Sequence, residues 1–418
     1  MAKRYAPFYP TLALPLQRGG DQKEMLSNFF QFYFPTKVLF QAGLAKDFSN
    51  ELSQLSITRI LLVTDATLLN SGMISPILEG LKTAGMEKIE IFSEVPPNSE
   101  LRTVKKAAEK GLKIKAEGVL AIGGGSVIDT AKAANILLTL GGDLVADYSG
   151  AHTLTAPLKP LIVIPTTAGT GSEVTQVAVI LDEENGVKLS FLDRYLYPSL
   201  AILDPELTVS MPPKLTAMTG MDALTHAIEA YTSLEANPYS DALSVRAISL
   251  IQKYLIQAVE EGKNLEARSA MLVASNLAGV AFDHAMVGVV HSMSHSIGAV
   301  AHVPHGLANS ILLPWGMEYN FEVCREKYAE IAVSLEVDTR EMSTDEAGRA
   351  AIEKIKNLRS ELKRICGLPN SLKEAGVKET ELEKIAELSV EDGSSFYNPR
   401  EVVAEEVLKY LRRAYALF

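Results

Sequence analysis

The histidines of this chain are concentrated in one stretch. The sequence has seven histidines, and residues 284–305 hold five of them: His284, His291, His295, His302 and His305. A sixth, His226, follows Asp222 by four residues. Imidazole nitrogens together with a carboxylate are a typical ligand set for a divalent metal such as zinc or iron(II). The sequence therefore predicts a metal site.

The spacing of these residues favours helices as the elements that hold them. Asp222 and His226 are four residues apart, as are His291 and His295, so within each pair both side chains would share one face of a helix. His305 lies between a proline and a glycine, which predicts a turn that presents its side chain inward. One such histidine pair is a weak signal, because most helical histidines are ordinary core or surface residues. The H-E-x-x-H pattern of zinc proteases is absent from the sequence, which disfavours that class.

A second candidate site is a glycine-rich turn after an apolar run. Residues 118–122 are apolar, and three glycines and a serine follow at 123–126, before a helical segment. Consecutive glycines allow the backbone to approach a ligand closely, and the free N–H groups of a helix start favour an anion such as pyrophosphate. The pattern is not the G-x-G-x-x-G fingerprint, so an ordinary tight turn explains it equally well.

Two further segments have the composition of nucleotide contacts. Asp65 follows the apolar run 60–63, and a carboxylate there can bind the adenosine ribose and repel a 2′-phosphate. A helix N-cap is at least as common a role for such a residue. Residues 166–172 follow the apolar run 161–164 and are rich in hydroxyls and glycine, so they could wrap a nucleotide. A plain polar loop is the commoner reason for that composition.

The elements around these segments predict two domains after an N-terminal extension. At 418 residues, the chain is too long for one ordinary core. In residues 28–208, apolar runs alternate with amphipathic helical segments, which is typical of βαβ units and a mainly parallel, Rossmann-like sheet. Residues 209–418 have a helical pattern nearly throughout, as at Asn237-Pro238, an N-cap followed by a first-turn proline. Residues 1–27, rich in proline and glycine, are predicted to be the extension.

Composition disfavours several classes of protein. A net charge of −11 argues against nucleic acid as the main partner. Two cysteines allow neither a disulfide framework nor a thiolate metal cluster, and a reducing compartment is the expectation. Prolines at 7, 10 and 15 interrupt any signal-peptide core, and no apolar run reaches the length of a membrane span. We therefore expect a soluble, cytoplasmic protein.

Taken together, the motifs resemble those of one family. The segment G-M-D-A-L-T-H-A-I-E-A-Y at 220–231 resembles the metal motif of the iron-dependent (group III) alcohol dehydrogenases. V-H-S-M-S-H-S-I-G at 290–298 and P-H-G at 304–306 resemble that family's second block. G-G-G-S at 123–126 and P-T-T-A-G-T at 165–170 resemble its cofactor loops, and Y-N-P-R at 397–400 resembles its C-terminal signature. The resemblance extends from about residue 30 to the end of the chain.

This resemblance implies an architecture and a set of site residues. The architecture would be that of dehydroquinate synthase, with an α/β nucleotide-binding domain and an all-helical metal-binding domain. The metal ligands would be Asp222, His226, His291 and His305, and His295 would be catalytic, beside the nicotinamide and substrate. The implied cofactor-binding residues are Asp65, Asn98, Gly124, Gly125, Ser126, Asp129, Thr166, Thr167, Thr170 and Lys188. Iron(II) is implied by the resemblance alone, because the ligand set would also accept zinc or another divalent metal.

The implied function is hydride transfer between NAD(H) and a primary alcohol or aldehyde. Asp65 would favour NAD over NADP. The protein would be a homo-oligomer of two or more copies. Three alternatives stay open: a hydroxyacid–oxoacid transhydrogenase, a dehydroquinate-synthase-like lyase, and a metal- or nucleotide-binding protein without activity. The chain departs from the family pattern at Asp283-His284, where an Asn pair is usual, and at Trp315, where a His is frequent. These positions are expected to shape the pocket, so the substrate is open.

Overall fold

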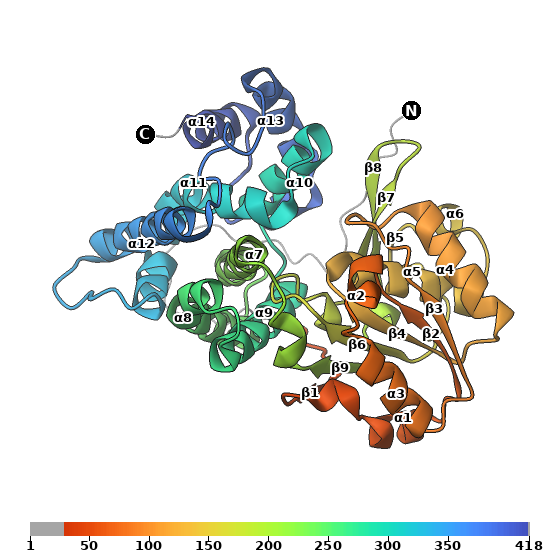
Figure 1. The fold of residues 1–418 in the computed structure, drawn as a ribbon. Coiled ribbons are helices and arrows are strands. Elements are labelled where there is room, and N and C mark those ends of the chain that lie inside the picture. Colours follow the sequence, from red (N-terminus) through yellow and green to blue (C-terminus); the bar gives the residue numbers. More distant parts are fainter. Residues whose placement is uncertain (1–28, 417–418) are drawn as a thin grey trace.

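The computed structural model describes residues 29–416, which form two lobes (Figure 1). The first lobe is built on a parallel sheet, and the second consists of helices. The predicted fold class is therefore confirmed. The predicted extension at 1–27 lies outside the described residues.

The main sheet of the first lobe has six parallel strands among the described residues. Their order across the sheet is β1 (Lys37–Phe40), β9 (Leu200–Leu203), β6 (Leu161–Pro165), β4 (Gly118–Gly123), β2 (Arg59–Val63) and β3 (Lys88–Phe92). The central strands β4 and β6 are buried along their whole length. Their continuous apolar sequences follow from this burial on both faces.

Helices cover both faces of this sheet (Figure 1). Successive side chains of a strand point to opposite faces, so in β2 Leu61 belongs to one apolar core and Leu62 to another. The helices and 3₁₀ turns of the lobe are η1 (Leu44–Lys46), α1 (Ser49–Leu55), α2 (Ala66–Asn70), α3 (Ser75–Thr83), α4 (Leu101–Lys113), α5 (Gly125–Leu140) and α6 (Leu144–Tyr148). The core containing Leu61 lies under α4 and α5, and the core containing Leu62 lies under α1 and α3.

A second, small sheet packs against α4 and α5 of the first lobe. It consists of β5 (Gly150–Ala151), β8 (Val187–Leu192) and β7 (Val177–Asp182), of which β7 and β8 form an antiparallel hairpin. The 3₁₀ turns η2 (Ser172–Val174) and η3 (Arg194–Leu196) connect this hairpin to β6 and β9, and η4 (Pro205–Thr208) lies between β9 and the helical lobe. The alternation of helices and apolar runs did not predict this sheet, since its strands are short or half exposed.

The second lobe packs around one large apolar core. Its elements are α7 (Pro213–Thr232), α8 (Pro238–Glu260), α9 (Leu265–Ala285), α10 (Val289–Ala301), α11 (His305–Ser334), α12 (Thr344–Cys366), η5 (Glu379–Glu381), α13 (Leu382–Glu391), η6 (Gly393–Tyr397) and α14 (Ala404–Tyr415). The predicted cap of α8 is confirmed, because the Asn237 side chain accepts from the backbone of Tyr239 and Ser240. From the end of β9 and the start of α7, we propose a domain boundary near 208.

Within residues 29–416, no single helix is long and apolar enough to cross a membrane. Helices α9 and α10 reach that length and composition only as a pair, and a bend of 100° separates them.

The two lobes approach each other closely at a pair of glycines. Gly171 has a φ of +62°, and a Cβ atom there would lie 2.4 Å from the Cα of Gly279 on α9. Beside it, a Cβ on Gly169 would lie 2.7 Å from the Thr219 backbone oxygen on α7. The segment 169–171 therefore rests directly on the backbones of α7 and α9, where a side chain has no room.

Candidate metal centre and cofactor loops

Three helices bring the four predicted metal ligands together. Asp222 and His226 come from α7, His291 from α10 and His305 from the start of α11. Their ligand atoms all lie within 4.8 Å of one another. His305 was expected in a turn, but it is the first residue of α11, because Pro304 ends the preceding loop in an extended conformation suited to a helix start.

The geometry and chemistry of this group fit a divalent metal. Ligand atoms about 2.0–2.2 Å from a common centre lie about 3.0–3.6 Å apart when neighbouring. The Nε2 atom of His305 lies 3.6 Å from Oδ1 of Asp222, within that range. Burial lowers the pKa of His226 to about 4, even though Asp222 acts in the opposite direction, so this imidazole is neutral at pH 7. A neutral imidazole is the form that binds a metal.

Glu229, which we did not predict, lies directly behind His291. Its Oε2 atom is 2.6 Å from Nδ1 of His291, and both residues are buried. Glu229 follows His226 by three residues and therefore shares its face of α7. This spacing of three residues could have identified Glu229 from the sequence as a neighbour of the metal ligands.

Two other side chains near the ligands were also not predicted. The amide nitrogen of Asn309 lies 2.7 Å from Oδ1 of Asp222, 3.2 Å from Nε2 of His291 and 3.1 Å from Nε2 of His305. The hydroxyl of Ser294 lies 3.2 Å from Nδ1 of His305. The Asn309 amide thus lies against three of the ligand atoms themselves, whereas Ser294 contacts His305 at its other ring nitrogen.

His295 lies beside the four ligands. Its ring stacks on that of His305, with centroids 5.2 Å apart and planes 13° apart. Its Nδ1 lies 3.0 Å from Oδ2 of Asp392, another residue that we did not predict. Burial acts to raise the pKa of Asp392, but His295 and the hydrogen bonds from Ser394 together lower this pKa below its usual value. The His295 side chain is about a third exposed and is oriented by a carboxylate.

The C-terminal signature motif positions α10. Oδ1 of Asn398 accepts from the backbone N–H of Val289, at the first turn of this helix. Farther along, the hydroxyl of Ser395 donates to that of Ser292 at 2.9 Å. The segment that contains Asp392 is therefore attached to the helix that carries His291 and His295.

The two predicted cofactor loops lie side by side in the first lobe. They follow the neighbouring strands β4 and β6, and the backbone N–H of Thr166 donates to the Gly123 carbonyl. A Cβ atom on Gly124 would lie 3.2 Å from the Thr167 side chain. One on Gly125 would lie 2.9 Å from that of Thr170. These loops form the carboxyl edge of a parallel sheet, which is where ligands bind in such folds.

Three more predicted cofactor residues surround the start of α5. The hydroxyl of Ser126 donates to the carbonyl of Pro97, which places the exposed Asn98 beside the glycine turn. Asp129 accepts from the Ser172 hydroxyl at 2.7 Å and from the Val179 N–H at 3.1 Å. Because both carboxylate oxygens have protein donors, these contacts support a role for Asp129 in holding the 172–179 segment rather than in direct contact with pyrophosphate.

The last two predicted cofactor residues are Asp65 and Lys188. Asp65 caps α2, since its Oδ1 accepts from the Leu68 N–H at 2.9 Å, and it lies at the end of β2. The cap and the predicted ribose contact are compatible. Lys188 on β8 lies toward the helical lobe, where its Nζ is 4.0 Å from the position of a Cβ on Gly298 of α10.

The residues that depart from the family pattern have packing roles. Asp283 accepts from the Gln176 N–H at 2.9 Å and from the Tyr197 hydroxyl. His284 stacks on Phe32 with ring centroids 4.1 Å apart. The Trp315 ring contacts the cationic groups of Lys356 and Arg413. The expectation that these positions shape the pocket is not supported by any of these contacts.

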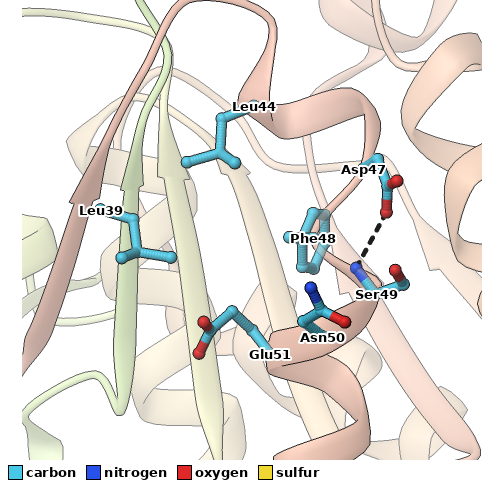
Figure 2. A pocket seen from close by; sticks show the side chains of 7 residues that line it. All are labelled: Leu39, Leu44, Asp47, Phe48, Ser49, Asn50 and Glu51. Carbon is cyan, nitrogen blue, oxygen red and sulfur yellow. Dashed lines mark hydrogen bonds between the residues drawn. The ribbon is translucent and has the colours of Figure 1, made fainter.

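A hollow of about 140 Å³ lies in the first lobe, between β1 and the segment that contains η1 and α1. Figure 2 shows the side chains around it. It is lined by Leu39, Leu44, Asp47, Phe48, Ser49, Asn50 and Glu51. Ligand pockets usually measure about 300–1,000 Å³, and none of these residues belongs to the metal group or the cofactor loops. The hollow is therefore not part of the candidate site.

Comparison with known proteins adds independent evidence. The model of the family described as "Iron-containing alcohol dehydrogenase" matches residues 35–205, and the model of "Fe-containing alcohol dehydrogenase family, C-terminal" matches residues 216–415. A choline dehydrogenase of Bacillus subtilis is 39% identical over 91% of this chain and 93% of its own. An NAD-dependent methanol dehydrogenase of Bacillus methanolicus is 36% identical over 92% of this chain and 99% of its own.

A solved structure of the alcohol dehydrogenase from Oenococcus oeni has the same fold. It superposes with a TM-score of 0.89 and 36% identity, over 93% of this chain and 100% of that one. The family resemblance of the sequence motifs is thereby confirmed over both lobes. The chain belongs to the iron-containing alcohol dehydrogenase family and is an oxidoreductase that acts on alcohols.

Proposed function

We propose that this protein transfers hydride between a primary alcohol and NAD⁺, and in reverse between NADH and an aldehyde. The observation that supports the proposal is the group of four ligand side chains beside His295. Asp222, His226, His291 and His305 would hold a divalent metal, for which iron(II) is our choice because of the family. When bound, the metal would polarise the substrate oxygen and the nicotinamide would exchange the hydride.

The proton of the alcohol hydroxyl is assigned to His295. Asp392 accepts from Nδ1–H of this ring, which leaves the lone pair of Nε2 free to take the proton directly or through a water molecule. Oxidation of the alcohol then yields aldehyde, NADH and one proton, and the charges balance. In the reverse direction, the His295 imidazolium returns the proton to the oxygen.

The cofactor is assigned to the first lobe. The glycines at 124 and 125 begin the 16-residue helix α5, whose N-terminal N–H groups and dipole favour pyrophosphate. The threonines at 166, 167 and 170 line the neighbouring loop, and Asn98, Ser126 and Lys188 border it. The name of the methanol dehydrogenase relative supports NAD as the cofactor. A homo-oligomer in the cytoplasm remains our prediction.

The test is metal analysis of the purified protein combined with an NADH absorbance assay. Candidate substrates are methanol, ethanol, butanol, 1,3-propanediol, choline and 4-hydroxybutyrate, assayed as isolated, after chelation and after iron reconstitution. We expect NADH formation that chelation removes and iron restores. Equal rates in the chelated enzyme would contradict the metal role. Turnover of a hydroxyacid–oxoacid pair without added NAD would instead favour the transhydrogenase alternative.

Asp65 is predicted to set the preference for NAD. Replacement of Asp65 by Gly should raise the NADP-to-NAD ratio of kcat/KM at least about tenfold, or about 1.4 kcal/mol, because a carboxylate no longer repels the 2′-phosphate. Glycine is also an acceptable helix N-cap, so α2 should persist. Asp65→Asn keeps the cap without the charge and should shift the ratio in the same direction. An unchanged ratio in both variants would rule out this role.

A further inference from the structure

A single buried carboxylate contacts both a predicted metal ligand and the start of the helix that carries it. Glu229 on α7 is 5% exposed. Its Oε2 lies 2.6 Å from Nδ1 of His291 and 3.3 Å from the backbone nitrogen of the same residue. Its Oε1 accepts from the backbone N–H of Val290 at 2.7 Å. Each of its oxygens therefore faces at least one N–H donor.

These contacts determine which nitrogen of His291 is free for a metal. Nδ1 faces Glu229, whereas Nε2 lies on the side of the other ligands, 3.2 Å from the same Asn309 amide that contacts Asp222 and His305. A carboxylate accepts hydrogen bonds and donates none, so it keeps the proton on Nδ1. The lone pair of Nε2 then points into the group of four.

We propose that Glu229 is a positioning residue for the metal centre. It selects the Nδ1–H tautomer of His291 and fixes the first turn of α10. The orientation of the His291 ring and the start of α10 therefore depend on the same carboxylate. Carboxylates that accept from the second nitrogen of a metal-binding histidine raise its basicity and fix its ring. This inference rests on the proposed function, since it assumes that the four residues bind a metal.

An amide cannot replace this carboxylate, although it has the same shape. In Glu229→Gln, the single oxygen can serve either His291 or Val290. If it accepts from His291, the amide N–H₂ group faces the Val290 N–H and both donors stay buried without an acceptor. If it accepts from Val290, the amide donates to Nδ1 of His291, and the ring proton moves to Nε2, where it blocks the metal. Either arrangement weakens metal binding.

The test compares cobalt(II) affinity of the full-length wild type and Glu229→Gln by competition with a chelator. Cobalt(II) is the probe because its visible absorption reports coordination. The matched control is Glu330→Gln. Glu330 on α11 accepts from the Tyr231 hydroxyl on α7, so it also links α7 to another helix, but it lies away from the metal ligands. Glu229→Gln should bind cobalt(II) about 10–100-fold more weakly, while Glu330→Gln is unchanged. NADH binding and the circular dichroism spectrum serve as folding checks.

A second measurement needs only the wild type and tests the tautomer directly. In the chelated enzyme with ¹⁵N-labelled histidine, the His291 signals, assigned by their loss in His291→Ala, should show the Nδ1–H tautomer. An Nε2–H tautomer would overturn the proposal, even if Glu229→Gln failed to fold. So would a folded Glu229→Gln protein that binds cobalt(II) as tightly as the wild type. If the wild type itself binds no cobalt(II), the proposed metal site fails instead.

Discussion

Replacement of His305 by alanine is expected to remove the metal and to lower kcat/KM for alcohol oxidation by at least about 10³-fold, which corresponds to about 4 kcal/mol of transition-state stabilisation. His305 supplies one of four ligand groups, and its ring also stacks on the proposed proton carrier His295. It begins α11 at the edge of the core and is a third exposed, so truncation leaves no large cavity and the fold should persist. Metal content and steady-state kinetics measure the two effects.

The matched control for this experiment is another histidine of the same stretch. His302 is exposed at the end of α10 with a φ of +55°, and asparagine tolerates that conformation better than most residues. His302→Asn should therefore retain both metal and activity. Full metal content in His305→Ala would refute the ligand assignment. Loss of metal in both variants would indicate general damage to the helical lobe.

Replacement of Gly171 by alanine is expected to lower the free energy of unfolding by about 2–5 kcal/mol, the sum of a left-handed backbone and an overfilled contact. The new Cβ would lie 2.4 Å from the Gly279 Cα and 3.3 Å from the Ser275 carbonyl oxygen. Both atoms belong to the backbone of α9, which cannot turn aside as a side chain would. Displacement of the loop would also move Thr170 from Gly125, so KM for NAD should rise.

Gly186 separates the two causes of this effect. It has a similar φ of +67°, but no atom lies within 4 Å of its Cβ position. Gly186→Ala should therefore cost only the backbone term of about 1–2 kcal/mol and should leave KM unchanged. Chemical denaturation of both variants measures the difference. Equal losses of stability would show that contact between the lobes contributes nothing at Gly171.

The fold class was predicted from local patterns, whereas the set of four ligands was implied by the family resemblance of short motifs. The central strands β4 and β6 are buried on both faces, so they are apolar without interruption, and this signal needs only a few adjacent residues. In the same way, a spacing of four residues brings Asp222 and His226 onto one face of any helix. The cap at Asn237 follows from its own side chain. Each of these features depends on neighbours within about one helical turn or one strand.

The partners of the site residues depend on the tertiary structure. Glu229 contacts His291 although the two are 62 positions apart in the sequence, and Asp392 contacts His295 although they are 97 positions apart. No periodicity links residues so far apart, because the packing of α7, α10 and the C-terminal segment against one another decides which side chains touch. The same holds for His284, which periodicity leaves undefined and which the structure stacks on Phe32.

Local motifs and the family resemblance thus predicted a set of side chains for a metal and a dinucleotide, although His305 was expected in a turn and instead begins α11. The packing of the lobes decides the rest. It brings three helices to one point, places Nδ1 of His291 against Glu229 and presses Gly171 against Gly279. The physical reason is the distance along the chain over which each effect acts. Backbone geometry and side-chain periodicity act over a few residues, whereas burial of the apolar core selects contacts between segments far apart in the sequence.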